Sequence, residues 1–177
     1  AGADWVEELG VEVMELLDTG LDPVSVVAAA PRGLFDRLDE VGRPLVVASE
    51  YETLTKAWIA QRGLDAEFVQ SFGATEVFPP EDADVIVDNT ATGSTLRAND
   101  LEIVDTVITS STRLFASPQA MENGVKRERI EDLRLLLVSV LDARRRVMVE
   151  VNATEDRLEE VVSLLQIGRH TSELQSR

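Results

Sequence analysis

The sequence predicts an α/β layered domain, because short β-branched runs alternate with amphipathic helical patterns along most of its 177 residues. Hydrophobic residues make up 44% and charged residues 28% of the chain, as in ordinary globular proteins. A chain of this length can bury a core and form one or two domains. No stretch approaches the roughly 18–20 consecutive apolar residues of a membrane-spanning helix. We therefore expect an α/β protein without a transmembrane segment.

The first part of the chain is predicted to form a short helix followed by two strands. Residues 5–9 read as the end of a helix, which Gly10 closes because glycine readily adopts the left-handed conformation of helix ends. Two runs, 11–17 and 24–30, are predicted as strands that the turn residues 18–20 separate.

The middle of the chain is predicted to alternate between strands and helices. A helix over 53–62 places Leu54, Ala57 and Trp58 on one face and ends at Gly63. The run 85–87 is typical of a strand that is buried on both faces, as in a parallel sheet. The strands predicted between residues 45 and 116 are 45–48, 66–69, 85–87, 104–109 and 113–116.

A long helix is predicted over residues 129–146, with acidic residues in its first turn and arginines in its last, as the helix dipole favours. Its apolar stripe consists of Ile130, Leu133, Leu137, Val140 and Leu141. The arginines at 144–146 are interpreted as a solvated helix end in preference to a phosphate site. A strand over 147–151 and a helix from Thr154 then look like the opening of a further domain.

Composition excludes several classes of chemistry and of partner. The absence of cysteine excludes disulfides and thiolate chemistry and is typical of a reducing cytoplasm. A formal net charge of −16 makes nucleic acid and anionic membranes poor partners. The only histidine, His170, lies in 166–177, which we interpret as a non-native tail from translated sequencing adapter, with a natural disordered terminus as the alternative. Without this tail, serine–histidine and histidine–metal chemistry are excluded.

The residues that carry chemistry follow the predicted strand 85–87. Asp88 ends this strand, at the edge where open α/β sheets bind their ligands. Its carboxylate is suited to accept hydrogen bonds from ribose hydroxyls. A loop of small and hydroxyl-bearing residues follows, whose N–H and O–H groups are suited to surround a phosphate: Thr92, Gly93, Ser94 and Thr95. Taken alone, the loop also fits a plain helix cap and turn.

Several ordered segments extend this signal: Gly2-Ala3-Asp4-Trp5-Val6-Glu7-Glu8-Leu9-Gly10, Glu15-Leu16-Leu17-Asp18-Thr19-Gly20, Gly73-Ala74-Thr75-Glu76, Ala83-Asp84-Val85-Ile86-Val87-Asp88 and Thr92-Gly93-Ser94-Thr95-Leu96-Arg97-Ala98-Asn99. In these segments, from residue 2 to about residue 165, the chain resembles the ATP phosphoribosyltransferase family. It departs from the family at 49–53, where Ser-Glu-Tyr-Glu-Thr replaces a lysine or similar residue followed by Tyr-Pro-Asn. The family's N-terminal strand and basic substrate-binding residues would precede Gly2.

The resemblance implies a bilobal catalytic core like the type II periplasmic binding proteins, with substrates in the cleft. Residues 1–42 and 112–146 would be the remainder of the first catalytic lobe, and residues 43–111 the second lobe with the phosphoribosyl loop. Residues 147–165 would begin the α+β regulatory domain of the family's long form.

The implied reaction transfers phosphoribose from phosphoribosyl pyrophosphate to N1 of ATP, with release of pyrophosphate, as the first step of histidine biosynthesis in the cytoplasm. Mg²⁺ is the implied cofactor, histidine the inhibitor of the parent protein, and a homo-oligomer the expected full-length assembly. No residue is assigned as catalytic or as a metal ligand, and residues 1–177 alone are expected to be inactive. The expected substrate-binding residues are Glu76, Asp88, Thr90, Ala91, Thr92, Gly93, Ser94 and Thr95.

Two other functions stay open. A solute-binding protein would share the fold, because a fold does not determine a function. It would, however, need a leader peptide and would not need the phosphoribosyl loop. A non-catalytic paralogue retained for assembly is the second alternative.

Overall fold

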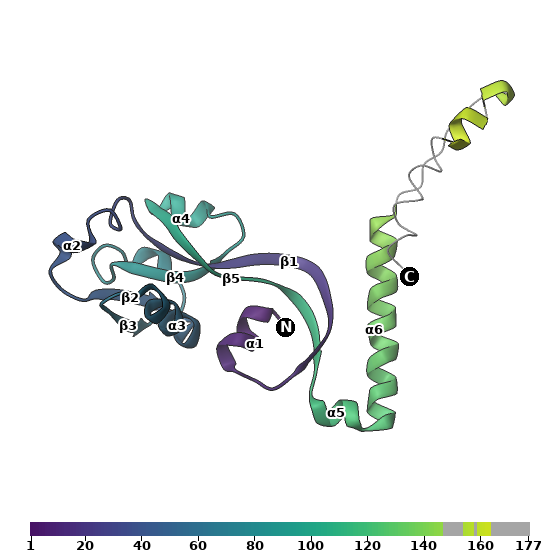
Figure 1. The fold of residues 1–177 in the computed structure, drawn as a ribbon, viewed down its shortest axis with the longest axis horizontal. Helices are drawn as coiled ribbons and strands as arrows, with labels where there is room; N and C mark the ends of the chain where they lie inside the picture. Colours follow the sequence, from purple (N-terminus) through teal and green to yellow (C-terminus); the bar gives the residue numbers. More distant parts are fainter. Residues whose placement is uncertain (147–153, 158, 164–177) are drawn as a thin grey trace. The chain divides into compact units, whose positions relative to one another are not determined.

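A computed structural model describes residues 1–146, 154–157 and 159–163. Residues 1–141 form one compact unit and residues 142–177 a second. The first unit contains a mixed sheet with the strand order β3-β2-β4-β1-β5, in which the long strands β1 and β5 run side by side (Figure 1). The strands are β1 (Met14–Pro31), β2 (Leu45–Ser49), β3 (Ala66–Gln70), β4 (Val85–Thr90) and β5 (Leu101–Ala116).

Helices connect these strands, and the α/β class predicted from the sequence is confirmed. The α-helices are α1 (Ala3–Leu9), α2 (Leu38–Val41), α3 (Glu52–Arg62), α4 (Ser94–Ala98), α5 (Pro118–Glu122) and α6 (Gly124–Arg145). Two 3₁₀ turns, η1 (Thr75–Val77) and η2 (Glu155–Arg157), complete the named elements. As predicted, α1 and α3 end at Gly10 and Gly63, both in the left-handed conformation. Within the described residues, no helix combines the length and the apolar character that a membrane span requires.

The predicted division of the two longest strands is wrong. Residues 11–17 and 24–30 were expected as separate strands, but β1 continues through the expected turn. Its register against β5 shifts between Asp18 and Leu21 and again between Leu21 and Val24, and Gly20 has a φ of 64°. Irregularities of this kind insert residues and bend a strand without ending its pairing. The same continuity joins the predicted strands 104–109 and 113–116 into β5.

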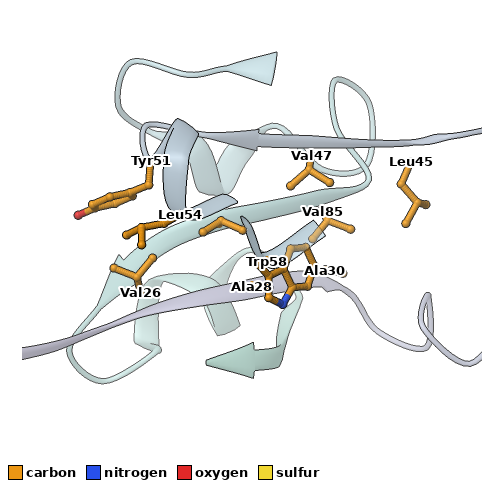
Figure 2. Packing of buried hydrophobic residues seen from close by; sticks show 10 residues of the cluster. Val26, Ala28, Ala30, Leu45, Val47, Tyr51, Leu54, Trp58 and Val85 are labelled. Carbon is orange, nitrogen blue, oxygen red and sulfur yellow. The ribbon is translucent and has the colours of Figure 1, made fainter. Parts of the chain in front are cut away.

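Strand β4 lies in the middle of the sheet and positions the candidate site. It pairs in parallel with β2 and antiparallel with β1, so the sheet is mixed and not purely parallel. Its residues Val85, Ile86 and Val87 are all buried, which confirms the predicted burial on both faces. Figure 2 shows part of the core on one face, where Val85 lies among residues of β1, β2 and α3. The opposite face packs Ile86 against Leu96 of α4.

Helix α3 covers one face of the sheet, and its N-terminus is held by α1. Leu54 and Trp58 are buried as predicted, whereas Ala57 is exposed and Thr55 is buried in its place. The carboxylate of Glu8 in α1 accepts hydrogen bonds from the backbone N–H groups of Thr53 (2.9 Å) and Leu54 (3.0 Å). Glu8 therefore satisfies two of the N–H groups that a helix start leaves without an intrahelical partner.

The C-terminal predictions are only partly covered by the structure. The predicted helix over 129–146 is confirmed as α6, which begins earlier, at Gly124. None of its residues is buried within the described structure, and two members of the predicted apolar stripe, Leu133 and Val140, are exposed there. The predicted strand 147–151 and the tail 166–177 lie outside the described residues. The helix predicted from Thr154 corresponds to η2 and a helical segment at 159–163.

We predict that Glu8→Ala lowers the free energy of unfolding by about 2 kcal/mol, because it removes a charged acceptor from two N–H groups at the start of α3. Chemical denaturation followed by circular dichroism measures this loss. Glu7→Ala is the matched control, because Glu7 is exposed on the same helix. Equal stabilities of the two variants would contradict the capping role of Glu8.

Candidate functional site

An open pocket of about 320 Å³ lies at the carboxyl end of β4. Open α/β sheets bind ligands at this end of their strands. The pocket is lined by Val24, Glu76, Asp88, Asn89, Thr90, Ala91, Thr92, Ser94, Thr95 and Leu96. The structure thus brings together every predicted site residue except Gly93, which belongs to the same loop but does not line the pocket.

The loop between β4 and α4 is organised by its own side chains. Thr90 Oγ1 accepts a hydrogen bond from the Gly93 N–H (2.8 Å), and Thr92 Oγ1 accepts one from the Ser94 N–H (3.4 Å). Gly93 has a φ of 67°, and an added Cβ would lie 3.1 Å from Nη1 of Arg97. Glycine is favoured here because a side chain at this φ would be strained and would have to displace the end of Arg97.

This internal bonding changes which donors the loop can offer to an anion. The N–H groups of Gly93 and Ser94, expected from the sequence to face a phosphate, are used inside the loop. Within the described residues, the N–H groups of Thr95 and Leu96 contact no acceptor. The Thr92 hydroxyl donates to Ser94 Oγ (3.0 Å) and is also used inside the loop. The loop therefore offers these two amides together with the hydroxyls of Thr90, Ser94 and Thr95, which line the pocket.

Asp88 is half-buried and lies beside these donors. Its Oδ1 accepts a hydrogen bond from the N–H of Asn89 (2.7 Å). Burial is the main cause that raises the pKa of Asp88 above its ordinary value, and the negative charges of Glu76 and Glu50 raise it further. The folded protein therefore disfavours the charged form of Asp88. A cation or a hydroxyl donor next to its carboxylate would stabilise that form.

Glu76 reaches the pocket from η1, which follows β3. The hydroxyls of Ser71 and Thr75, both buried, hydrogen-bond to each other (2.8 Å) and fix the start of this turn. Ala74, just before it, is in the left-handed conformation with a φ of 50°. The described lining of the pocket contains Glu76 and Asp88 but no basic side chain. An anion that bound in this pocket would therefore contact neutral hydrogen-bond donors and no cationic side chain of the described lining.

Three lining residues were missed by the sequence prediction: Val24, Asn89 and Leu96. Of these, Asn89 is tied to a buried network. Its Nδ2 donates to the hydroxyl of Tyr51 (3.1 Å), which donates to Oδ2 of Asp4 (2.9 Å). Asp4 belongs to the first family motif, and Tyr51 lies in the segment that departs from the family. The sequence comparison with the family therefore drew attention to both Asp4 and Tyr51. It did not indicate that the two side chains contact each other.

The raised pKa of Asp88 predicts a pH-dependent stability. Because the folded protein binds this proton more tightly than the unfolded chain, the folded state is favoured at low pH. This contribution to the free energy of unfolding is lost as the pH rises from the ordinary pKa of 3.8 through the raised pKa of Asp88. We expect Asp88→Asn to be more stable than the wild type at pH 7, with a difference that shrinks as the pH falls through the raised pKa of Asp88 and is largely gone below about pH 4.

Thermal unfolding at a series of pH values measures this difference. Asp65→Asn is the control, because Asp65 is an exposed carboxylate elsewhere on the surface. A wild type that is as stable as Asp88→Asn at pH 7 would show that Asp88 is not destabilising.

The fold and the site agree with comparisons to known proteins. The model of the family "HisG: ATP phosphoribosyltransferase" matches residues 1–139. ATP phosphoribosyltransferases of Chlorobium luteolum and Thermodesulfovibrio yellowstonii are 38% and 36% identical over 169 residues, which cover 93% of this chain and 58% of each relative. The chain thus spans somewhat over half the length of these relatives.

A solved structure also shares the fold. The ATP phosphoribosyl transferase (HisG:HisZ) complex from Thermotoga maritima superposes with a TM-score of 0.70 at 24% identity, covering 81% of this chain and 69% of that one. The family model and this fold agree with the order of the motifs in the sequence, from the segment around Asp4 to the loop after β4. The chain belongs to the ATP phosphoribosyltransferase family.

Proposed function

We propose that this chain supplies the phosphoribosyl-binding part of an enzyme that transfers phosphoribose from phosphoribosyl pyrophosphate to N1 of ATP. Pyrophosphate is released, and the reaction is the first step of histidine biosynthesis. The observation that supports this proposal is the meeting of Asp88 with the hydroxyl-rich loop in one pocket of a chain of this family.

Each part of the pocket has a role in the proposed reaction. Asp88 accepts hydrogen bonds from the ribose hydroxyls, and its negative charge favours the cationic sugar of the transition state. The 5-phosphate is held by neutral donors: the N–H groups of Thr95 and Leu96 and the hydroxyls of Ser94 and Thr95. The Thr92 hydroxyl donates to Ser94 Oγ and so directs the Ser94 proton outward from this bond. Thr90, Ala91 and Gly93 shape the loop, and Glu76 adds a second carboxylate. These donors are positioned before the substrate binds, so little reorganisation is needed during the reaction.

Magnesium fits this donor set as a companion of the substrate. Within the described residues, no group of three or more metal-binding side chains is close enough to hold an ion by itself. Mg²⁺ commonly uses one or two carboxylates together with substrate phosphates. Asp88 and Glu76 are the carboxylates that would hold it here, and the ion would neutralise the leaving pyrophosphate.

The larger organisation follows from the same proposal. Residues 1–42 and 112–146 would belong to one catalytic lobe, residues 43–111 to the other, and residues 147–165 to a regulatory domain through which histidine inhibits the parent protein. The uncovered apolar residues of α6 support burial of this helix in a larger assembly, such as a homo-oligomer. The absence of cysteine supports a cytoplasmic location.

The remaining rival is a non-catalytic paralogue that keeps the fold for assembly. Membership of the family disfavours a solute-binding protein, but it does not separate an enzyme from such a paralogue. Retention of a phosphosugar site is the property that separates them, because an assembly protein does not need the charge arrangement around Asp88.

We predict that phosphoribosyl pyrophosphate with Mg²⁺ binds the wild type and that Asp88→Ala weakens this binding about 10- to 100-fold. This range corresponds to the loss of a charged hydrogen-bond acceptor. Isothermal titration calorimetry measures the affinities, with Asp65→Ala as a control that removes an exposed carboxylate outside the pocket. Equal affinities of the wild type and Asp88→Ala would reject the ribose role of Asp88.

A further inference from the structure

Asn89 is the pocket residue whose side chain is hydrogen-bonded to the network around Tyr51. It follows Asp88 on β4, and successive residues of a strand point to opposite faces of the sheet. Val87 and Tyr51 belong to the core cluster on the face of α3, whereas Ile86 and Leu96 belong to the cluster on the other face. Asn89 thus shares the α3 face, and its Nδ2 contacts the Tyr51 hydroxyl there.

The hydrogen bonds around Tyr51 determine which way the Asn89 amide points. Asp4 is buried, and its two carboxylate oxygens accept from Ser110 Oγ (2.6 Å) and from the Tyr51 hydroxyl (2.9 Å). The Ser110 hydroxyl in turn accepts from the Asp4 N–H (3.1 Å), so its own proton is available for Asp4. The single proton of the Tyr51 hydroxyl is therefore directed to Asp4.

With its proton committed to Asp4, the Tyr51 oxygen can only accept from Asn89. The amide of Asn89 must place its NH₂ group toward Tyr51, because its carbonyl oxygen cannot donate. Burial and the nearby Asp4 carboxylate also raise the pKa of Tyr51, which keeps the phenol protonated and the arrangement intact over the physiological range. The amide is locked in one of its two orientations.

This lock leaves Oδ1 of Asn89 as a free acceptor beside the pocket. Within the part of the chain that the structure describes, Oδ1 contacts no donor, and Asn89 is exposed and lines the pocket. We infer that Oδ1 of Asn89 accepts a hydrogen bond from a hydroxyl of the bound phosphosugar and that Tyr51 is the residue that positions it. This inference rests on the proposed function.

Asn89 and Asp88 then contact the sugar from the two sides of the strand end. The two acceptors differ in charge, because Asp88 is a carboxylate and Asn89 a neutral amide. A neutral acceptor adds a hydroxyl contact without adding a further negative charge to a pocket that already contains Asp88 and Glu76. This contact would help the site to recognise a sugar hydroxyl next to an anionic phosphate.

The test is calorimetric titration of phosphoribosyl pyrophosphate with Mg²⁺ into the wild type, Asn89→Ala, Tyr51→Phe and the double variant. Loss of one neutral hydrogen bond predicts an affinity about 3- to 10-fold lower for Asn89→Ala. Tyr51→Phe frees the amide to rotate, so we expect it to weaken binding by up to the same factor. The double variant is expected to bind no more weakly than Asn89→Ala, because Tyr51 acts through Asn89.

Thr55→Val is the matched control for the loss of a buried hydroxyl near the start of α3. Thr55 is fully buried, and its hydroxyl has no hydrogen-bond partner among the described residues, so Thr55→Val is expected to leave binding unchanged. Thermal unfolding of every variant reports stability separately. A structural role of Tyr51 would lower the affinity of the double variant below that of Asn89→Ala, and this would overturn the positioning role.

Other outcomes distinguish this inference from the proposed function. Wild-type affinity of Asn89→Ala, together with weakened binding by Asp88→Ala, would overturn the role of Asn89 alone. A titration with ATP is the second arm, and a loss confined to ATP would overturn the assignment of the donor to the phosphosugar. A wild type that binds no phosphoribosyl pyrophosphate would overturn the proposed function and this inference together.

Discussion

The buried carboxylate of Asp4 is the constraint on which the arrangement of α1, α3 and the pocket residue Asn89 depends. A buried charge is strongly destabilising unless hydrogen bonds replace its water, so the groups around Asp4 must stay in place. Ser110 of β5 and Tyr51 before α3 supply those bonds, which joins α1 to the sheet and to α3. Glu8, one turn further along α1, caps α3 and strengthens the same junction. One short helix thus holds together segments that are far apart in the sequence.

The same junction extends to the pocket through Asn89. Because Tyr51 has one proton to donate, the demand of Asp4 for a donor determines the orientation of an amide at the strand end. A stabilising interaction in the interior therefore determines the orientation of an exposed side chain that lines the pocket. The segment that departs from the family pattern around Tyr51 contains the residue that makes this connection.

The pocket combines a carboxylate in an unfavourable environment with a loop that is fixed by its own hydrogen bonds. Asp88 is half-buried near Glu76 and Glu50, and all three effects disfavour its charge in the folded protein. A substrate that brings hydroxyl donors and a cation would relieve this unfavourable environment. The loop next to it is arranged differently, because Thr90 and Thr92 bond the N–H groups of Gly93 and Ser94 and so rigidify the backbone. Unfavourable charge and a preformed loop are both expected at a binding site.

Local sequence determined the elements whose cause is local. Apolar runs predicted β2, β3 and β4, glycines predicted the ends of α1 and α3, and the order of the motifs predicted the family. Only the tertiary structure decided that the two predicted N-terminal strands form one strand, because pairing with β5 continues across Gly20. It also decided which donors of the loop remain free and that Asn89 is oriented through Tyr51 and Asp4. These properties depend on contacts between residues such as Asp4 and Ser110, 106 positions apart, which no local pattern encodes.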